Sequence, residues 1–336
     1  MAVTACSVAH PPVVWSGDNM EFTAELDDGA CEGTYRLQDD FIALLSELVG
    51  VALDERVVYV QVDADRVGEY CSEQSPGGCA SGRTAVSTRA FSRHELAHVV
   101  TIAAGWRGPS PFVEGVAEMF NDGVDPDESR AAVDEVLADF RITDAHYYTM
   151  GLFVRFLVER HGLDALAGFM RATDSRAARA AYEATFSAHF GEPLADAIAA
   201  FEAYPTCPEW SNRIALYECS RPLQPWRGGV LDVSAEVDCR DPAVFGPLDN
   251  ERGSLGAFAA FEVAAAGTYA VEVRSEVPGF AGVRVTRCGS CWDEVDFGVA
   301  AGELESVALP AGRYYATFVA SAQAPGRIDL RVAPEP

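Results

Sequence analysis

The sequence contains no lysine, so arginine supplies every strong positive charge, and the formal net charge of the 336 residues is -26. An acidic excess of this size repels phosphate backbones and anionic lipids, which argues against nucleic acid or a membrane surface as a partner. No apolar run approaches the ~20 residues that a membrane-spanning helix needs. A G-x-S-x-G nucleophile motif and a glycine-rich phosphate loop are also missing. We therefore expect a soluble chain, and its length predicts two domains.

Nine cysteines are many for a chain of this size, and several stand close together in sequence rich in glycine, proline and serine. This usage is typical of an oxidising compartment, so we expect an extracellular, periplasmic or cell-surface protein. The expected disulfides are Cys71–Cys79, Cys207–Cys219 and Cys6–Cys31. The pairing of Cys239, Cys288 and Cys291 stays open; the CGSC spacing at 288–291 resembles half of a zinc knuckle, but it favours a disulfide because a second pair is missing.

The first residues, MAVTAC, have neither the charged nor the apolar region of a secretion signal, so we expect that a signal has been removed. VTAC also resembles the end of a lipoprotein signal, which would make Cys6 a site of lipid attachment. A secreted protein and a surface lipoprotein are therefore both open.

Two kinds of hydrophobic periodicity divide the chain near residue 205. Before it, helical spacing predominates at 35–50, 125–140, 145–162 and 175–204, with β-branched strands at 56–63 and 82–91. After it, short alternating strands at 256–263, 267–276, 282–288, 306–321 and 326–332 are typical of an antiparallel sandwich. We predict an α+β fold with a first domain over 1–205, built of a small sheet and helices. A linker at 206–220 and an all-β sandwich over 221–336 follow.

The stretch HELAHVVTIAAGWRGPSPFVEGVAE, residues 94–118, contains the residues with the clearest chemistry. Ser92 and Glu95 have the spacing of a capping box, so we expect a helix to begin at the motif. Positions four apart share one face of a helix, so His94 and His98 can direct both imidazoles at one zinc ion. Glu95 is then turned toward the side where a water on that metal would lie.

A catalytic zinc needs a third protein ligand, and Glu114 is the best candidate. It follows His98 by 16 residues, after a turn containing glycine and proline that lets a second helix fold back on the first. Glu118 lies one helical turn further on the same face and could accept a hydrogen bond from the second nitrogen of a ligating histidine, or itself be the third ligand. We expect one zinc per chain, held by His94, His98 and Glu114.

The two segments HELAH and PFVEGVAE resemble the gluzincin branch of the zincin metallopeptidases, in which a downstream glutamate completes the HExxH site. The segments at 147–162 and 186–202 are similar to the helices that follow this site in thermolysin-like relatives, and the resemblance covers roughly residues 55–205. It implies a zincin fold and peptide hydrolysis by a zinc-activated water, with Glu95 taking the proton and passing it to the leaving amine. The GAMEN segment of the aminopeptidase relatives is absent, which favours an endopeptidase.

The resemblance also implies an oxyanion donor from a later helix, for which DAHYYTMG offers His146, Tyr147 and Tyr148. Tyr147 is favoured because it stands four residues before Gly151, where similar sequences place their tyrosine. The strand at 84–91 is expected to be the sheet edge that pairs with an extended peptide substrate.

The remaining motifs are less specific. Carboxylates in NDGVDPDES and CRDPAVFGPLDNERG could bind calcium, but neither has EF-hand spacing, and a helix cap and a loop explain them. The strands of the second domain, with LPAGRYY, loosely resemble the pre-peptidase domains appended to secreted proteases, and we expect this domain to bind a surface ligand or substrate. Two functions are open: a secreted zinc endopeptidase, and an extracellular binding protein with a catalytically inert zincin fold. The presence of Glu95 favours the enzyme.

Overall fold

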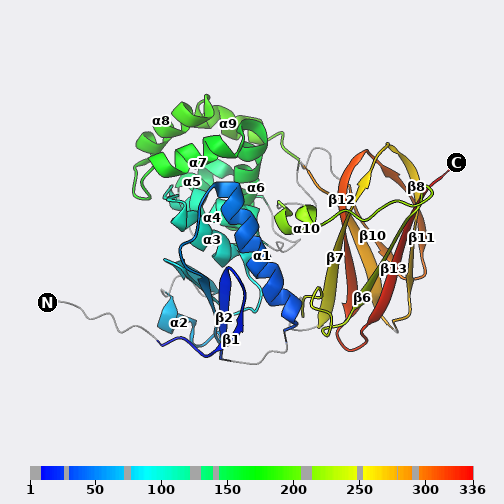
Figure 1. Cartoon of the computed structure of the whole chain (residues 1–336). Helices are drawn as coiled ribbons and strands as arrows, with labels where there is room; N and C mark the ends of the chain where they lie inside the picture. The colour runs from blue at the N-terminus through cyan, green and yellow to red at the C-terminus, as the bar shows by residue number, and fades with distance from the viewer. Residues whose placement is uncertain are drawn as a thin grey trace.

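The computed structural model describes residues 9–25, 30–71, 77–121, 130–138, 144–205, 214–247, 253–277, 279–289 and 295–335. A helical part with one five-stranded sheet lies beside a part made of two four-stranded sheets, at the left and right of Figure 1. The predicted α+β composition is confirmed. Within the described residues, no helix has both the length and the apolar character that crossing a bilayer requires.

The five-stranded sheet consists of β1 (Val13–Ser16), β2 (Met20–Ala24), β3 (Val57–Gln61), β4 (Gly78–Ser81) and β5 (Thr84–Ser87). Their order across the sheet is β1-β2-β3-β5-β4. β3 runs parallel to both of its neighbours, whereas β1 and β4 are antiparallel to the strands beside them. All five residues of β3 are buried, which explains its run of β-branched and aromatic residues.

The sheet edge near the HExxH segment is β4, so the prediction that the strand at 84–91 forms this edge is wrong. β5 is enclosed, because it pairs with β3 on one side and with β4 on the other. Gly82 adopts a φ of 56° in the turn between the two strands and allows β4 to fold back onto β5. The sequence of β4, GCAS, has little strand propensity, so the pattern of residues did not reveal it.

The helices of the described residues are α1 (Glu32–Val49), α2 (Val67–Tyr70), α3 (Arg93–Ala103), α4 (Ser110–Met119), α5 (Val133–Ala138), α6 (Asp144–His161), α7 (Leu163–Ala172), α8 (Arg179–Phe190), α9 (Leu194–Phe201) and α10 (Leu216–Ser220). α1 ends at Gly50, which adopts the left-handed conformation with a φ of 69°. Ser92 is the N-cap residue of α3, but its side chain makes no capping hydrogen bond, so the predicted capping box is wrong. The carboxylate of Glu95 lies instead against β4.

The C-terminal part confirms the predicted antiparallel sandwich. One sheet has the order β10-β9-β12-β7 and the other β11-β8-β13-β6. Ile328, Leu330 and Val332 alternate inward along one strand and are at most 1% exposed, as in a sheet with one face against a core. Two of the strands, β6 and β10, were not predicted. The bounds are β6 (Leu231–Val237), β7 (Ser254–Val263), β8 (Gly267–Ser275), β9 (Ala281–Arg287), β10 (Asp296–Ala300), β11 (Leu304–Leu309), β12 (Gly312–Ser321) and β13 (Gly326–Pro334).

Three disulfides occur among the described residues: Cys31–Cys239, Cys71–Cys79 and Cys219–Cys288. The Cys71–Cys79 prediction is confirmed. Cys31 pairs with Cys239 and Cys219 with Cys288, so the predictions that placed them with Cys6 and Cys207 are wrong; short sequence spacing was a poor guide to distance in the fold. Cys6, Cys207 and Cys291 lie outside the described residues, as do residues 122–129 of NDGVDPDES and residues 248–252 of CRDPAVFGPLDNERG, the two stretches considered for calcium.

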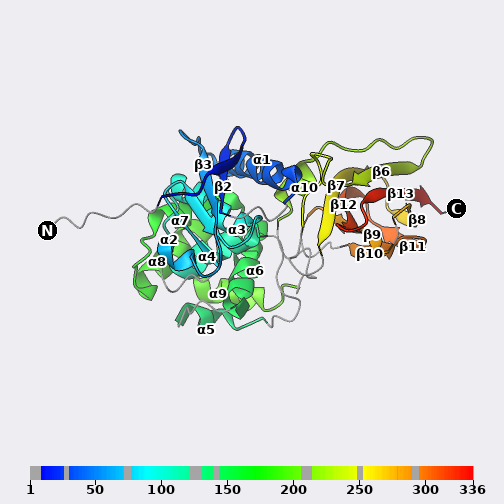
Figure 2. The same ribbon diagram turned by 90° about the horizontal axis from the view of Figure 1, so that it is seen from below.

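The sandwich packs closely against the helical part. The Cys31–Cys239 disulfide joins the start of α1 to the turn after β6, and the Cys31 amide donates to the Gly246 carbonyl over 2.9 Å. Leu37, Tyr217 and Phe245 form a small buried cluster at this junction. In both views α10 lies between the two parts (Figures 1 and 2).

Candidate metal centre

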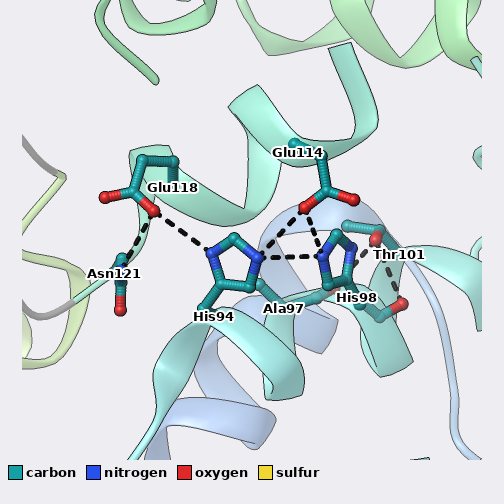
Figure 3. Close-up of polar contacts among 7 residues, drawn as sticks. All are labelled: His94, Ala97, His98, Thr101, Glu114, Glu118 and Asn121. Atoms are coloured by element: carbon teal, nitrogen blue, oxygen red, sulfur yellow. Dashed lines mark hydrogen bonds and ion pairs between the residues drawn. The ribbon is translucent and has the colours of Figure 1, made fainter. Parts of the chain in front are cut away.

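The candidate centre lies between α3 and α4, which approach each other after a tight turn. Gly105 adopts a φ of 77° just beyond α3, and the Trp106 amide donates to the Thr101 carbonyl, so the helix ends there. Pro109 then serves as the N-cap residue of α4. This turn brings Glu114 and Glu118 over the face of α3 that carries His94 and His98 (Figure 3).

Three side-chain atoms converge on one point. Glu114 Oε2 lies 3.1 Å from His94 Nε2 and 3.1 Å from His98 Nε2, and the two imidazole nitrogens are also 3.1 Å apart. Among the described residues, His94, His98 and Glu114 form a group of histidines and acids whose ligand atoms lie close enough together to hold one metal ion. Zinc bonds of about 2.0–2.1 Å at tetrahedral angles place neighbouring ligand atoms roughly 3.4 Å apart, so the observed triangle fits that ion closely.

Glu118 contacts the other nitrogen of His94. Its Oε2 atom lies 3.2 Å from His94 Nδ1 and accepts a hydrogen bond from Asn121 Nδ2 over 3.0 Å. Glu118 is 8% exposed. Sequence reasoning missed Asn121, which lies just beyond the end of α4 and three residues after Glu118.

The electrostatics of the cluster favour a positive charge at this point. Burial by itself would lower the pKa of His94, but hydrogen bonds to Glu114 and Glu118 outweigh it and raise the pKa to about 10. Burial would raise the pKa of Glu114, but hydrogen bonds from the two histidines hold it well below its ordinary value. The two carboxylates therefore stabilise a positive charge on His94.

Glu95 lies beside this triangle but outside it. A Cβ atom added to Gly78 would lie 2.8 Å from Glu95 Oε1, so the carboxylate rests against the edge strand β4 where a side chain is absent. Burial is the main cause that raises the pKa of Glu95; the nearby histidines lower it less. Gly78 was not predicted as part of the site, because its contact with Glu95 depends on the unrecognised strand β4.

The packing of α4 on α6 positions Tyr147. A Cβ atom on Gly115 would lie 2.6 Å from the Met150 carbonyl oxygen, and one on Gly151 would lie 2.8 Å from Glu118 Cγ, so both glycines permit the close approach. The Tyr147 ring packs edge to face with His94, with 5.5 Å between ring centroids. Tyr148 is buried, at 7% exposure. The structure therefore brings Tyr147 to His94, together with the residues predicted from α3 and α4.

No family model matches the sequence, and no curated protein matches it. Among solved structures, similarity is found to the pre-peptidase C-terminal domain of collagenase from Bacillus anthracis, with 12% identity over 30% of this chain and 86% of that chain and a TM-score of 0.23. TmCBM61 in complex with β-1,4-galactotriose is similar over 32% of this chain and 83% of that chain, with 16% identity and a TM-score of 0.17. A mutant of a family 29 carbohydrate-binding module is similar over 34% of this chain and 78% of that chain, with 11% identity and a TM-score of 0.16.

Proposed function

We propose that this chain is a zinc-dependent peptidase of the gluzincin type that hydrolyses internal peptide bonds. The observation that supports this best is the convergence of His94 Nε2, His98 Nε2 and Glu114 Oε2, each 3.1 Å from the other two, with Glu95 beside them. Two histidines and one carboxylate are a ligand set of catalytic zinc sites, which keep one position for water or substrate.

In this proposal His94, His98 and Glu114 hold the ion. Bound zinc lowers the pKa of a coordinated water to about 7 and polarises a carbonyl group. Glu118 keeps a proton on His94 Nδ1 and thereby directs the other nitrogen toward the ligand triangle. This contact fixes both the tautomer and the ring orientation.

Glu95 is the general base and then the general acid. It accepts a proton from the attacking water and gives it to the departing amine nitrogen, which breaks the peptide bond without leaving a charged amide anion. Its partly buried position against Gly78 keeps the carboxylate next to the site. Tyr147 donates a hydrogen bond to the oxygen of the carbonyl as negative charge develops on it.

The position of β4 at the end of the five-stranded sheet suits an extended substrate. The backbone groups of an edge strand can pair with a peptide, and β4 starts at Gly78, the residue in contact with Glu95. A peptide paired with this edge would pass beside the general base. The absence of a GAMEN segment favours an endopeptidase over an aminopeptidase.

The disulfides and the sandwich support a role outside the cytosol. Disulfides persist in oxidising compartments, so we assign the protein to the extracellular space, the periplasm or the cell surface. In this proposal the sandwich binds a surface ligand or a large substrate, while the helical part carries out the chemistry.

The test is a paired measurement of zinc content and peptide hydrolysis on the wild type and on Glu95→Gln. We expect about one zinc per chain in both proteins, because Glu95 is not a ligand, and a rate lower by about two to four orders of magnitude in the variant. Glu47→Gln, a change on the exposed face of α1, is the matched control and should behave as wild type. An unbiased peptide library would supply the substrates.

Three outcomes would contradict the proposal. A wild-type protein purified without chelator that contains no transition metal would exclude the zinc site. Equal hydrolysis by wild type and Glu95→Gln at equal zinc content would exclude Glu95 as the base. Zinc bound without any hydrolysis would favour the alternative of an extracellular binding protein with an inert zincin fold.

A further inference from the structure

A buried ion pair connects the metal-binding helix to the segment that leads into the sandwich. Arg93 Nη2 donates to Glu218 Oε1 over 2.9 Å, and the two side chains are 1% and 0% exposed. Arg93 is the first residue of α3 and directly precedes His94. Its guanidinium group also lies within 5.6 Å of the Phe41 ring centroid and 5.3 Å of the Phe91 ring centroid. The first turn of α3 is therefore anchored by a charged group enclosed in protein.

Glu218 belongs to a segment that contacts both ligand-bearing helices and the sandwich. We call residues 214–224, which include α10, the connector. Its first residue, Ile214, donates its amide to the Met119 carbonyl at the end of α4 over 2.8 Å. Cys219 forms a disulfide with Cys288, and the Gln224 amide donates to the Ala260 carbonyl of β7 over 2.7 Å. The connector thus lies between α3, α4 and the sandwich, as both views show (Figures 1 and 2).

We propose that Arg93 and Glu218 are positioning residues of the metal centre, through which the connector fixes α3 relative to α4. This inference rests on the zinc site of the proposed function. It adds that the geometry of this site depends on the connector, which is attached to the sandwich. Two ligand atoms come from α3 and one from α4, so their spacing depends on how the two helices are held. The connector is bonded to both helices, at Arg93 and at Met119.

The physical reason is the cost of separating buried charges. A small shift of the first turn of α3 would separate the Arg93 guanidinium from the Glu218 carboxylate and weaken the attraction between two charges inside the protein, where water cannot replace it. A hydrogen bond between ionised groups is also stronger and more directional than a neutral one. The pair therefore restricts the position of His94 and Glu95, the next two residues.

The experiment replaces the pair by uncharged side chains of similar size in the full chain, as Arg93→Met/Glu218→Met. Apolar replacement of a buried ion pair often preserves folding, so the protein should stay folded. Because Arg93 directly precedes the ligand His94, we expect zinc affinity to fall about 10–100-fold, as when a residue that orients a metal ligand is lost. We also expect the visible absorption bands of the cobalt(II)-substituted protein to shift, which a loss of stability alone would not cause.

The matched control is a second ion pair with one fully buried partner. Arg284 and Asp296 lie in the sandwich, where Asp296 is 0% exposed. Arg284→Met/Asp296→Leu should leave zinc affinity and the cobalt spectrum unchanged. Glu218→Gln retains the shape and an oxygen acceptor but removes the carboxylate charge beside the buried Arg93 guanidinium, so it should produce a change in the same direction as the double variant, and it decides the question if the double variant does not fold.

The outcomes distinguish this inference from the proposed function. Wild-type spectra and affinities in both Arg93→Met/Glu218→Met and Glu218→Gln would overturn the inference and leave the peptidase proposal intact. A wild type that binds cobalt, loses affinity in these variants and cleaves no peptide would support the inference and overturn the peptidase proposal. A wild type that binds neither zinc nor cobalt would overturn both.

Discussion

Glu118 lies against the nitrogen of His94 that faces away from Glu114, with Oε2 3.2 Å from Nδ1. Because Asn121 donates to the same oxygen, the Glu118 carboxylate is itself held in place. A proton on Nδ1 then points at Glu118, and Nε2 is directed toward Glu114 and His98, where its lone pair would face a bound ion once the second proton is lost. The orientation of the His94 ring is thus set by Glu118, which does not itself contribute to the ligand triangle.

Replacing Glu118 by alanine should lower zinc affinity about 10–100-fold without abolishing binding, because the three ligand atoms remain. Competition with a chelator of known affinity measures this change. Glu47→Ala on the exposed face of α1 provides the control. If Glu118→Ala removes the zinc while Glu114→Ala retains it, the roles of the two glutamates are reversed.

The placement of the candidate metal ligands within each helix could be predicted from the sequence. The spacing of His94 and His98 on one helical face, and of Glu114 and Glu118 on the next, depends on helix geometry alone. The helical and sandwich regions could also be separated, because their hydrophobic periods differ.

The parts that were missed depend on contacts between distant residues. Cys31 pairs with Cys239 over a separation of 208 residues, and Arg93 pairs with Glu218 over 125. No local pattern specifies such partners. β4 was missed for a different reason, since four residues of weak strand propensity become a strand only by pairing with β5.

The pH dependence of the chelated protein should reveal the charge on His94. Its folded pKa of about 10 lies above the ordinary value of 6.5 because of the hydrogen bonds to Glu114 and Glu118, which outweigh burial. A group whose pKa is raised by folding contributes stability that is fully present below its unfolded pKa. This stability is lost as the pH rises through its folded pKa. We therefore expect the thermal unfolding midpoint of the chelated protein to decrease as the pH is raised from 6.5 to about 10.

The same charge predicts proton release when the metal binds. Zinc takes the place of a proton on His94, so binding near neutral pH should release about one proton per chain. Calorimetric titrations in two buffers of different ionisation enthalpy measure this number. Identical binding heats in the two buffers would show that His94 carries no proton to displace.

Tyr147→Phe should test the oxyanion donor. Removing one such hydrogen bond lowers kcat by about 10²–10³, whereas zinc content and KM should change little. Tyr148→Phe is a control on the neighbouring residue, whose ring is buried. If Tyr147→Phe keeps the wild-type kcat and His146→Ala loses it, the histidine is the donor instead.

Two disulfides that involve cysteines of the helical part should differ in their contribution to stability: Cys31–Cys239, which links it to the sandwich, and Cys71–Cys79, which lies within it. Cys31–Cys239 closes a loop with a separation of 208 residues, and Cys71–Cys79 closes one of only 8. In the chain-entropy account, replacing the first by serines costs about 5 kcal/mol of unfolding free energy and replacing the second costs about 2.5 kcal/mol, because the longer loop constrains the unfolded chain more. Urea denaturation of Cys31→Ser/Cys239→Ser and Cys71→Ser/Cys79→Ser measures both values. The two variants should retain zinc, since no cysteine is a ligand in the proposed site. A larger loss in the Cys71 and Cys79 variant would mean that this disulfide stabilises the folded edge strand β4 directly, because loop closure alone predicts the opposite order.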